Sequence, residues 1–419
     1  LKIEPDLVRV VTPDVGGGFG MKTFYYPEQA LCLWSARKFG RPVKWVAERG
    51  ESFLSDTMGR DHVTQVDMAF DSENQIVGMR VDTVANMGAY LSNFAPYIPT
   101  LAAIKVMPGV YDIKSLYARV RGVFTHTVPV DAYRGAGRPE SIYMIERLMD
   151  KAAQELGVDR IQLRRKNFIS SKIMPFTTTA DEIYDSGDFD RVINMVTARA
   201  NWQTFGDRRA EAKNLGRRRG IGLCYYIEST MGDPGEAAEV RFEPDGTVSL
   251  LVGTQSNGQG HETAYAQVAS DRLGVPIEEI RIVQGDTDLV ATGGGTGGSR
   301  SLTAQATAID AAADLVIERG KHYAAQGLEA AFADIEFEDG TFKIAGTDRH
   351  IAILDLAHQA RTMDAPTNDI DGGLDARGTI TLPAWTFPNG CHVAEVEIDP
   401  QTGVTSLESY TIVDDFGTL

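Results

Sequence analysis

Along the chain, hydrophobic residues recur either at every second position, which predicts a strand, or at every third or fourth position, which predicts a helix. Residues 247–252 alternate in the manner of a strand, and residues 262–273 carry apolar side chains at helical spacing up to Gly274. Helical spacing also predicts helices over residues 27–39, 140–156, 189–201 and 301–321. Alternation predicts strands over residues 43–47, 63–70, 76–84, 117–123, 221–227, 239–243 and 280–284. Because hairpins and helices are mixed, the pattern favours an α+β fold over a regular βαβ series.

Turn and cap residues agree with these boundaries. Asp159 is placed to cap a short helix that runs through Arg165. Turn residues join the predicted strands 63–70 and 76–84 into a hairpin, and Asp339-Gly340 and residues 401–403 predict two more.

The length predicts more than one domain. At 419 residues the chain exceeds the usual size of a single hydrophobic core. The polar, arginine-rich residues 203–219 are the best candidate for a linker. We therefore expect two lobes, residues 1–202 and residues 220–419.

Composition excludes several classes of protein. The net charge of −17 disfavours nucleic acid as a partner, and no apolar run approaches the roughly 20 residues of a membrane span. Cys32, Cys224 and Cys391 are scattered singly, without metal-ligand or disulfide spacing. A reducing compartment suits such cysteines, so we predict a cytoplasmic protein.

Glycine-rich turns are the feature that points to function. The most prominent spans residues 253–267, and similar turns occupy residues 16–22, 133–138 and 293–301. A glycine turn before a helix exposes backbone N–H groups that lack a helical partner and favour an anion. A tight connection that uses glycine for backbone freedom would explain any one turn alone. Four such turns predict convergence on one large ligand approached by the backbone.

The sequence offers no protein-held metal centre. None of the seven histidines has metal-ligand spacing, and His261 is more consistent with a structural hydrogen bond than with metal ligation. Asp286 and Asp288 favour a turn over a cation site. Residues 16–22 match neither the Rossmann nor the Walker spacing, and no serine nucleophile elbow is present. A catalytic metal would therefore have to be held by a cofactor.

Five ordered motifs carry a family resemblance that covers nearly the whole chain. They are residues 10–22, 132–135, 258–263, 285–288 and 298–301. Together they resemble the molybdopterin-binding large subunit of the molybdenum hydroxylases, a family that includes xanthine dehydrogenase, aldehyde oxidoreductase and aerobic carbon monoxide dehydrogenase. The resemblance implies a two-lobed α+β fold of the xanthine dehydrogenase and aldehyde oxidoreductase type. It is strongest to the large subunits that resemble carbon monoxide dehydrogenase but lack its cysteine.

The resemblance also assigns roles to residues. Gln259 matches the glutamine beside the apical molybdenum ligand, and Phe19 and Gly20 match the loop nearest the metal. The active-site loop that faces the substrate is matched by Arg134, Gly135 and Ala136. The cofactor-binding positions so implied are Gly18, Gly258, Gly260, His261, Glu262, Thr263, Gly298, Ser299, Arg300 and Ser301. No side chain of the protein is expected to bind the metal itself.

The implied reaction is hydroxylation of an aldehyde or N-heterocycle carbon with oxygen from water. The cofactor would be molybdopterin with molybdenum, as the cytosine dinucleotide, and electrons would pass through [2Fe–2S] clusters to FAD. These redox groups would lie on partner domains or on two partner chains, an FAD-binding medium subunit and a [2Fe–2S] small subunit, in a dimer of heterotrimers. No membrane span and no nucleic acid are expected.

Three departures from the family pattern qualify these expectations. Gly135 stands where carbon monoxide dehydrogenase has the cysteine that holds copper, and Ala136 stands where xanthine dehydrogenase has a stacking aromatic ring. The Gly-x-Gly-Glu segment with the family's general base is also absent. We therefore expect a fragment of a longer polypeptide, inactive alone. A non-catalytic scaffold of the same family and a nucleotide-binding protein are the alternatives.

Overall fold

The chain forms two compact units whose boundaries do not follow the chain order. The computed structural model describes residues 2–4, 7–365 and 373–417. Unit 1 contains Leu1–Gly18 and Thr230–Trp385, and unit 2 contains Phe19–Ser229 and Thr386–Leu419. The expected lobes, residues 1–202 and 220–419, follow the chain order, whereas in these two units the amino-terminal tail belongs to unit 1 and the last hairpin belongs to unit 2.

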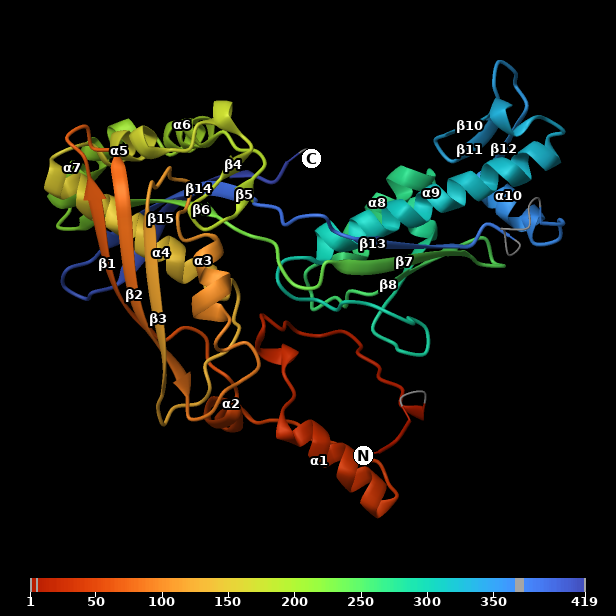
Figure 1. Ribbon diagram of the computed structural model, residues 1–419, viewed down its shortest axis with the longest axis horizontal. Coiled ribbons are helices and arrows are strands. Elements are labelled where there is room, and N and C mark those ends of the chain that lie inside the picture. The colour runs from red at the N-terminus through yellow and green to blue at the C-terminus, as the bar shows by residue number, and fades with distance from the viewer. Residues whose placement is uncertain (1, 5–6, 366–372, 418–419) are drawn as a thin grey trace. The chain divides into compact units, whose positions relative to one another are not determined.

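Unit 1 is built on a four-stranded sheet backed by a long helix (Figure 1). The sheet has the order β13-β7-β8-β9, from β13 (Ala376–Thr381), β7 (Gly235–Phe242), β8 (Val248–Val252) and β9 (Ile280–Val283). Strands β8 and β9 run parallel because the helix α8 (His261–Leu273) crosses between them, and the other two pairs are antiparallel. A smaller sheet contains β10 (Ile335–Glu338), β11 (Thr341–Ile344) and β12 (His350–Ala352).

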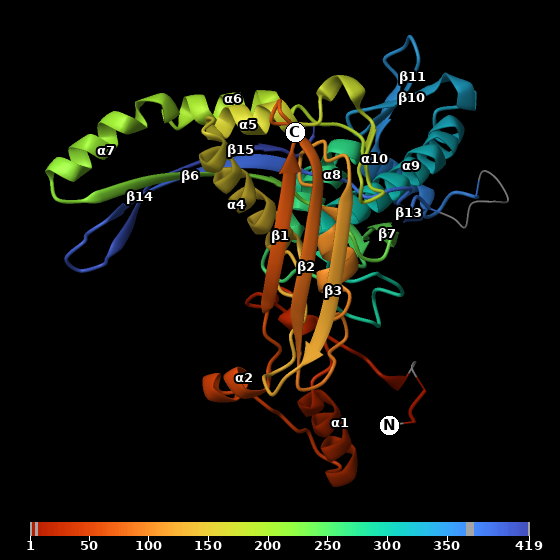
Figure 2. The same ribbon diagram turned by 60° about the vertical axis from the view of Figure 1, so that its left-hand side comes forward.

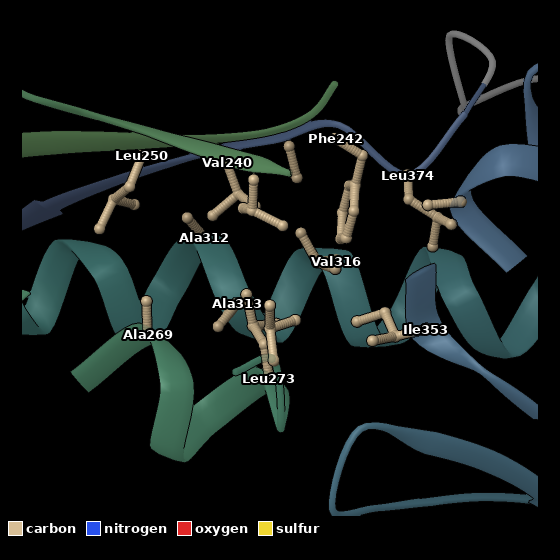
Figure 3. Packing of buried hydrophobic residues seen from close by; sticks show 14 of the residues in the cluster. Val240, Phe242, Leu250, Ala269, Leu273, Ala312, Ala313, Val316, Ile353 and Leu374 are labelled. Atoms are coloured by element: carbon tan, nitrogen blue, oxygen red, sulfur yellow. The ribbon is translucent and has the colours of Figure 1, made fainter. Parts of the chain in front are cut away.

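The core of unit 1 lies between this sheet and α9 (Ser301–Gly327), with α8 and α10 (Ile353–Ala360) beside it (Figure 3). Val240 and Leu250 of the sheet pack over Ala312 and Val316 of α9. The small helix residues let the strand approach closely, since a side-chain carbon on Gly378 would lie 2.3 Å from the Ala312 nitrogen. The position of α9 is thus fixed by close packing along its length.

Unit 2 contains two three-stranded sheets and most of the remaining helices (Figures 1 and 2). The first sheet has the order β1 (His62–Phe70), β2 (Ile76–Gly88) and β3 (Leu116–Phe124), and the second has the order β15 (Thr405–Asp415), β14 (Asn389–Ile398) and β6 (Arg218–Ile227). A short hairpin pairs β4 (Phe176–Thr177) with β5 (Ile183–Tyr184). The helices are α1 (Pro27–Phe39), α2 (Arg49–Ser55), α3 (Ala103–Lys105), α4 (Arg138–Leu156), α5 (Arg160–Asn167), α6 (Phe189–Arg199) and α7 (Phe205–Asn214).

Most predicted elements are confirmed, and the Asp159 side chain caps α5 by accepting from the Ile161 and Gln162 amides. One prediction is wrong, because residues 43–47 form no strand. The residues proposed as a linker, 203–219, contain the helix α7 and the start of β6. None of the described helices is long and apolar enough to cross a membrane.

Candidate functional site

The amino-terminal tail of unit 1 is held by the turn that follows β9. The Thr12 amide donates to the Gly285 carbonyl at 2.7 Å, and Val11 and Asp286 form a β-bridge. Arg9 donates from Nε to the Asp286 carboxylate at 3.0 Å, and this hydrogen bond is the main reason that the pKa of Asp286 is lowered. Asp286 therefore organises a turn, and this turn brings residues 16–18 to the rest of unit 1.

The central glycine turn is anchored from behind by α9. Gln305, which is fully buried, accepts at Oε1 from the amides of Gly253 and Thr254, at 3.1 and 3.2 Å. Its Nε2 donates to the Ala237 carbonyl at 2.9 Å. The Thr254 hydroxyl lies 2.7 Å from the hydroxyl of Tyr265 on α8. Sequence reasoning missed Gln305, because no local pattern links residues 52 positions apart.

The turn ends in the first residues of α8. Gly260 is left-handed, with φ 82°, and precedes His261. Gln259 lies exposed, and its Oε1 accepts from the Asn257 amide at 2.6 Å. Glu262 accepts from Gln284 Nε2 at 2.6 Å, and the exposed Thr263 belongs to the same first helical turn. In the described part of the chain, the first amides of this helix have no acceptor, so they can bind a ligand.

Within the part of the turn that the structure describes, Gln255 Oε1 and His261 Nδ1 are buried side-chain atoms without a hydrogen-bond partner, and His261 is the buried residue of the two. Burial lowers its pKa, so the ring is neutral near pH 7. It keeps a hydrogen bond to the Thr254 backbone, while Nδ1 has no partner within the described residues. The structural hydrogen bond expected for His261 is present, and the remaining ring nitrogen can accept or donate one more.

The second glycine turn of unit 1 packs directly against the first. A side-chain carbon on Gly293 would lie 2.3 Å from the Gly253 Cα. The Thr296 hydroxyl donates to the Gln255 carbonyl at 2.6 Å. Gly298 has φ 67° and lies close to the backbone of Met231. A side-chain carbon on Gly298 would lie 2.3 Å from the Met231 carbonyl oxygen. Two of the predicted turns thus form one continuous glycine-lined surface, to which Gly18 is added through contact with Asn257.

Arg300 supports this surface from inside. Its side chain is 1% exposed and forms an ion pair with Glu236 at 2.9 Å. It also donates to three backbone carbonyls, those of Asp233, Gly235 and Gly295, at 2.7 to 2.8 Å. The guanidinium is therefore committed to the protein, and what Arg300 and its neighbours Ser299 and Ser301 offer a ligand is the backbone at the start of α9.

Unit 2 brings together the other predicted residues. The Arg134 amide donates to the Phe19 carbonyl at 2.8 Å, and the Arg134 guanidinium lies 5.8 Å from the Phe19 ring centre. Gly20 has φ 105°, and a side-chain carbon there would lie 2.5 Å from the Ala132 carbonyl oxygen. Phe19 is 55% exposed. Phe19, Gly20 and Arg134 therefore lie together on unit 2.

The loop after Arg134 is tightly constrained. Gly135 has φ 95°, and a side-chain carbon there would lie 2.3 Å from Cγ of Pro139. Ala136 also has a positive φ, of 41°. Arg60 donates to the carbonyls of Tyr133 and Arg134 and forms an ion pair with Glu140 at 3.5 Å. Sequence reasoning missed Arg60, which lies 74 positions from the loop that it holds.

The donor set suits a bulky anionic ligand more than a bare metal ion. Within the described residues no group of three or more His, Cys, Asp and Glu side chains is arranged to hold a metal. Unit 1 instead offers two helix starts, glycine-lined backbone and the unpartnered His261 Nδ1. These residues fit a phosphate-bearing heterocycle bound through backbone and side-chain hydrogen bonds.

Comparison with known proteins gives matches over nearly the whole chain. Two family models described as molybdopterin cofactor-binding domains match residues 1–168 and 195–419. The chain is 34% identical to the carbon monoxide dehydrogenase large chain of Hydrogenophaga pseudoflava, over 99% of this chain and 54% of that protein. It is 32% identical to subunit gamma of the 6-hydroxypseudooxynicotine dehydrogenase complex of Paenarthrobacter nicotinovorans, over 94% and 50%. The chain thus spans about half the length of these curated relatives.

Solved structures agree with the fold expected from the resemblance. Quinoline 2-oxidoreductase from Pseudomonas putida 86 matches with a TM-score of 0.92 and 33% identity, over 99% of this chain and 55% of that one. A Cu,Mo-CO dehydrogenase matches with a TM-score of 0.90 and 30% identity, over 98% and 54%. The aldehyde oxidoreductase from Desulfovibrio gigas, at 22% identity and a TM-score of 0.79 over 100% and 44%, shares the fold.

Proposed function

Because this chain belongs to the molybdopterin cofactor-binding family of molybdenum hydroxylase large subunits, we propose that it binds this cofactor in an enzyme that hydroxylates carbon. The observation that carries the proposal is the glycine-lined surface of unit 1, where two turns are fixed from behind and leave helix-start amides free. Such a surface binds phosphate and pterin edges through the backbone.

Specific residues would hold the cofactor, in its cytosine dinucleotide form. Gly258, Gly260, Glu262, Thr263, Gly298, Ser299 and Ser301 would supply backbone or hydroxyl contacts, with Gly18 beside them. His261 would contribute Nδ1, and Gln259 would lie near the metal. When bound, the cofactor supplies a molybdenum centre that takes up two electrons as oxygen from water is added to carbon.

We propose that Phe19, Gly20, Arg134, Gly135 and Ala136 line the substrate side. The exposed Phe19 ring can stack on a flat aromatic ring, and the exposed Arg134 guanidinium can donate hydrogen bonds to a ring nitrogen or a carbonyl oxygen. Two relatives bear the names nicotine 6-hydroxylase and quinoline 2-oxidoreductase, and both substrates contain an N-heterocycle.

Copper chemistry with carbon monoxide is the less favoured alternative. A copper ligand would need a cysteine at position 135, where φ is 95° and a side-chain carbon would overlap Pro139. Glycine at this position is therefore built into the loop, and we assign the substrate to the aldehyde or N-heterocycle class.

The complete enzyme would pass electrons to [2Fe–2S] clusters and FAD. We propose that these redox groups lie on a small and a medium partner subunit, in a cytoplasmic dimer of heterotrimers. The carbon monoxide dehydrogenase relatives are themselves named as large chains, which is consistent with such partners.

The test uses the complete natural polypeptide with its partners. Metal analysis should find about one molybdenum per chain, and denaturation should release a pterin nucleotide. Dye reduction by a panel of N-heterocycles, aldehydes and carbon monoxide then assigns the substrate class. A protein that carries neither molybdenum nor pterin would instead be a scaffold. Within the active enzyme, Gln259→Ala should lower kcat while the exposed control Gln401→Ala leaves it unchanged.

A further inference from the structure

In unit 2, residues 27–55 expose more large apolar side chains than is usual for a segment that faces solvent. Neither α1 nor α2 buries a single residue. In α2, Phe53 and Leu54 are 78% and 81% exposed. In both Figure 1 and Figure 2, no other helix or strand of unit 2 runs along the length of α1. This segment, which we call the 27–55 arm, lacks the partner that its composition requires.

The apolar residues of α1 surround the helix. Leu31, Leu33, Trp34 and Phe39 are 49% to 61% exposed. At about 100° per residue, Leu33 points away from Leu31 and Phe39, so these side chains do not share one face. Polar residues, among them Glu28, Ser35 and Lys38, lie between these apolar positions, so α1 has no single apolar face. One flat contact would cover only part of it, so the partner must reach more than one side.

Residues 42–47, which follow α1, have the composition of a strand but no neighbouring strand in the described chain. Val43, Trp45 and Val46 are strand-forming types, and they are 38%, 44% and 69% exposed. No backbone hydrogen bond joins residues 42–47 to another described residue. Strand geometry needs a partner to satisfy these groups.

The charge of the arm indicates what kind of partner fits. The 27–55 arm holds five basic and three acidic residues, and all five basic residues lie within residues 37–49, in a chain whose net charge is −17. No ion pair engages Lys38, Arg41, Lys44 or Arg49 anywhere in the described ranges. A partner with carboxylates beside an extended apolar segment would complement both features.

We propose that the 27–55 arm is the docking surface for an extended, acidic segment of the same polypeptide, outside these 419 residues, which pairs with residues 42–47. The curated relatives are about twice as long as the matched region, so chain of the required length exists in proteins of this family. A partner in the same chain is present at a high effective concentration, so it can cover the apolar side chains on several sides of α1 within one folded protein.

The experiment uses the complete natural polypeptide. p-Benzoylphenylalanine is placed at Val46, and the same photoreactive residue at Leu215, which is 73% exposed, is the matched control. Irradiation of a mixture of ¹⁴N- and ¹⁵N-labelled protein, followed by peptide mass spectrometry, identifies the neighbour and separates links within a chain from links between chains. Hydrogen exchange of residues 42–47 is measured in the same preparation.

The expected result is an intrachain link from position 46 to an acidic peptide outside the 419 residues, with no such link from position 215. The amides of residues 43–46 should exchange about 100-fold or more slowly than in an unstructured peptide. A link between two copies, a link to a separate protein, a link inside the 419 residues, or unprotected amides would each overturn the proposal. A natural reading frame no longer than 419 residues would overturn it as well.

Discussion

The buried pair of Arg300 and Glu236 gives the sharpest test of how the glycine surface is built. Replacing Arg300 with methionine keeps much of the volume but leaves a carboxylate that is 0% exposed without its cation. It also removes the donors of three backbone carbonyls, those of Asp233, Gly235 and Gly295. Breaking one side of a buried ion pair costs about 3–5 kcal/mol. Domains are stable by only about 5–15 kcal/mol, so unit 1 should lose a large part of its stability.

Two further variants separate charge from geometry. Arg300→Lys keeps the positive charge but loses the planar fork, and at about 1 kcal/mol per lost hydrogen bond we expect a cost of about 2 kcal/mol. In the double variant Arg300→Met with Glu236→Leu, no charge remains buried. Its loss should be smaller than the sum of the two single losses by about 2–3 kcal/mol.

Urea unfolding measures these differences if the signal comes from unit 1. Trp385 is the one tryptophan in the sequence of unit 1, because Trp34, Trp45 and Trp202 belong to unit 2. Fluorescence of a protein that keeps Trp385 alone therefore reports on unit 1, and hydrogen exchange of residues 293–299 reports on the turn. A loss below about 1 kcal/mol for Arg300→Met, or full additivity in the double variant, would refute this account of the pair.

Four smaller predictions test other parts of the fold and site. Gln305→Leu should cost about 2–3 kcal/mol in urea unfolding, since two buried amides of the central turn lose their acceptor. Gly20→Ala should cost about 2 kcal/mol or more because of its φ of 105° and its close carbonyl contact, while the matched control Gly16→Ala, with no atom within 4 Å, should be nearly neutral. Asp159→Ala should cost about 1 kcal/mol through loss of the α5 cap, measured by thermal unfolding. Burial lowers the pKa of His261 in the folded state, so its neutral ring should stabilise the fold above about pH 6.5, and this contribution should be lost as the pH falls through the lowered pKa. His261→Gln should remove this pH dependence of the unfolding free energy. NMR titration of the imidazole checks the direction of the pKa shift.

Residue periodicity and turn residues predicted most of the secondary structure. The predictions differ from the structure where an element depends on a partner strand or on how much of a helix is buried. The helices at α4 and α8 follow from periodicity and from Gly157 and Gly274 at their ends. Residues 43–47 have strand composition but no partner in the described chain, and a strand exists only as part of a ladder. The helix α7 buries only Ala212 and is charged nearly all round, so its sequence resembles a linker.

The glycine turns could be found from sequence, but the side chains that hold them could not. Gln305 and Arg60 act across 52 and 74 positions, and nothing in the local sequence distinguishes them from other polar residues. Arg300 lies in a predicted motif, yet sequence cannot tell whether its guanidinium faces a ligand or the protein interior. The structure places it inside, where four acceptors surround it.

These observations explain why glycine and buried polar residues occur together at this surface. A ligand held by backbone amides needs turns without side chains, but glycine is the residue that loses the most conformational freedom on folding. Gln305 and Arg300 offset this loss by fixing the turns through amides and carbonyls that face the interior. Among the described residues, the first amides of α8 and α9 have no helical acceptor and can bind a ligand. Loosening either buried side chain should therefore weaken cofactor binding even though neither is expected to touch the cofactor.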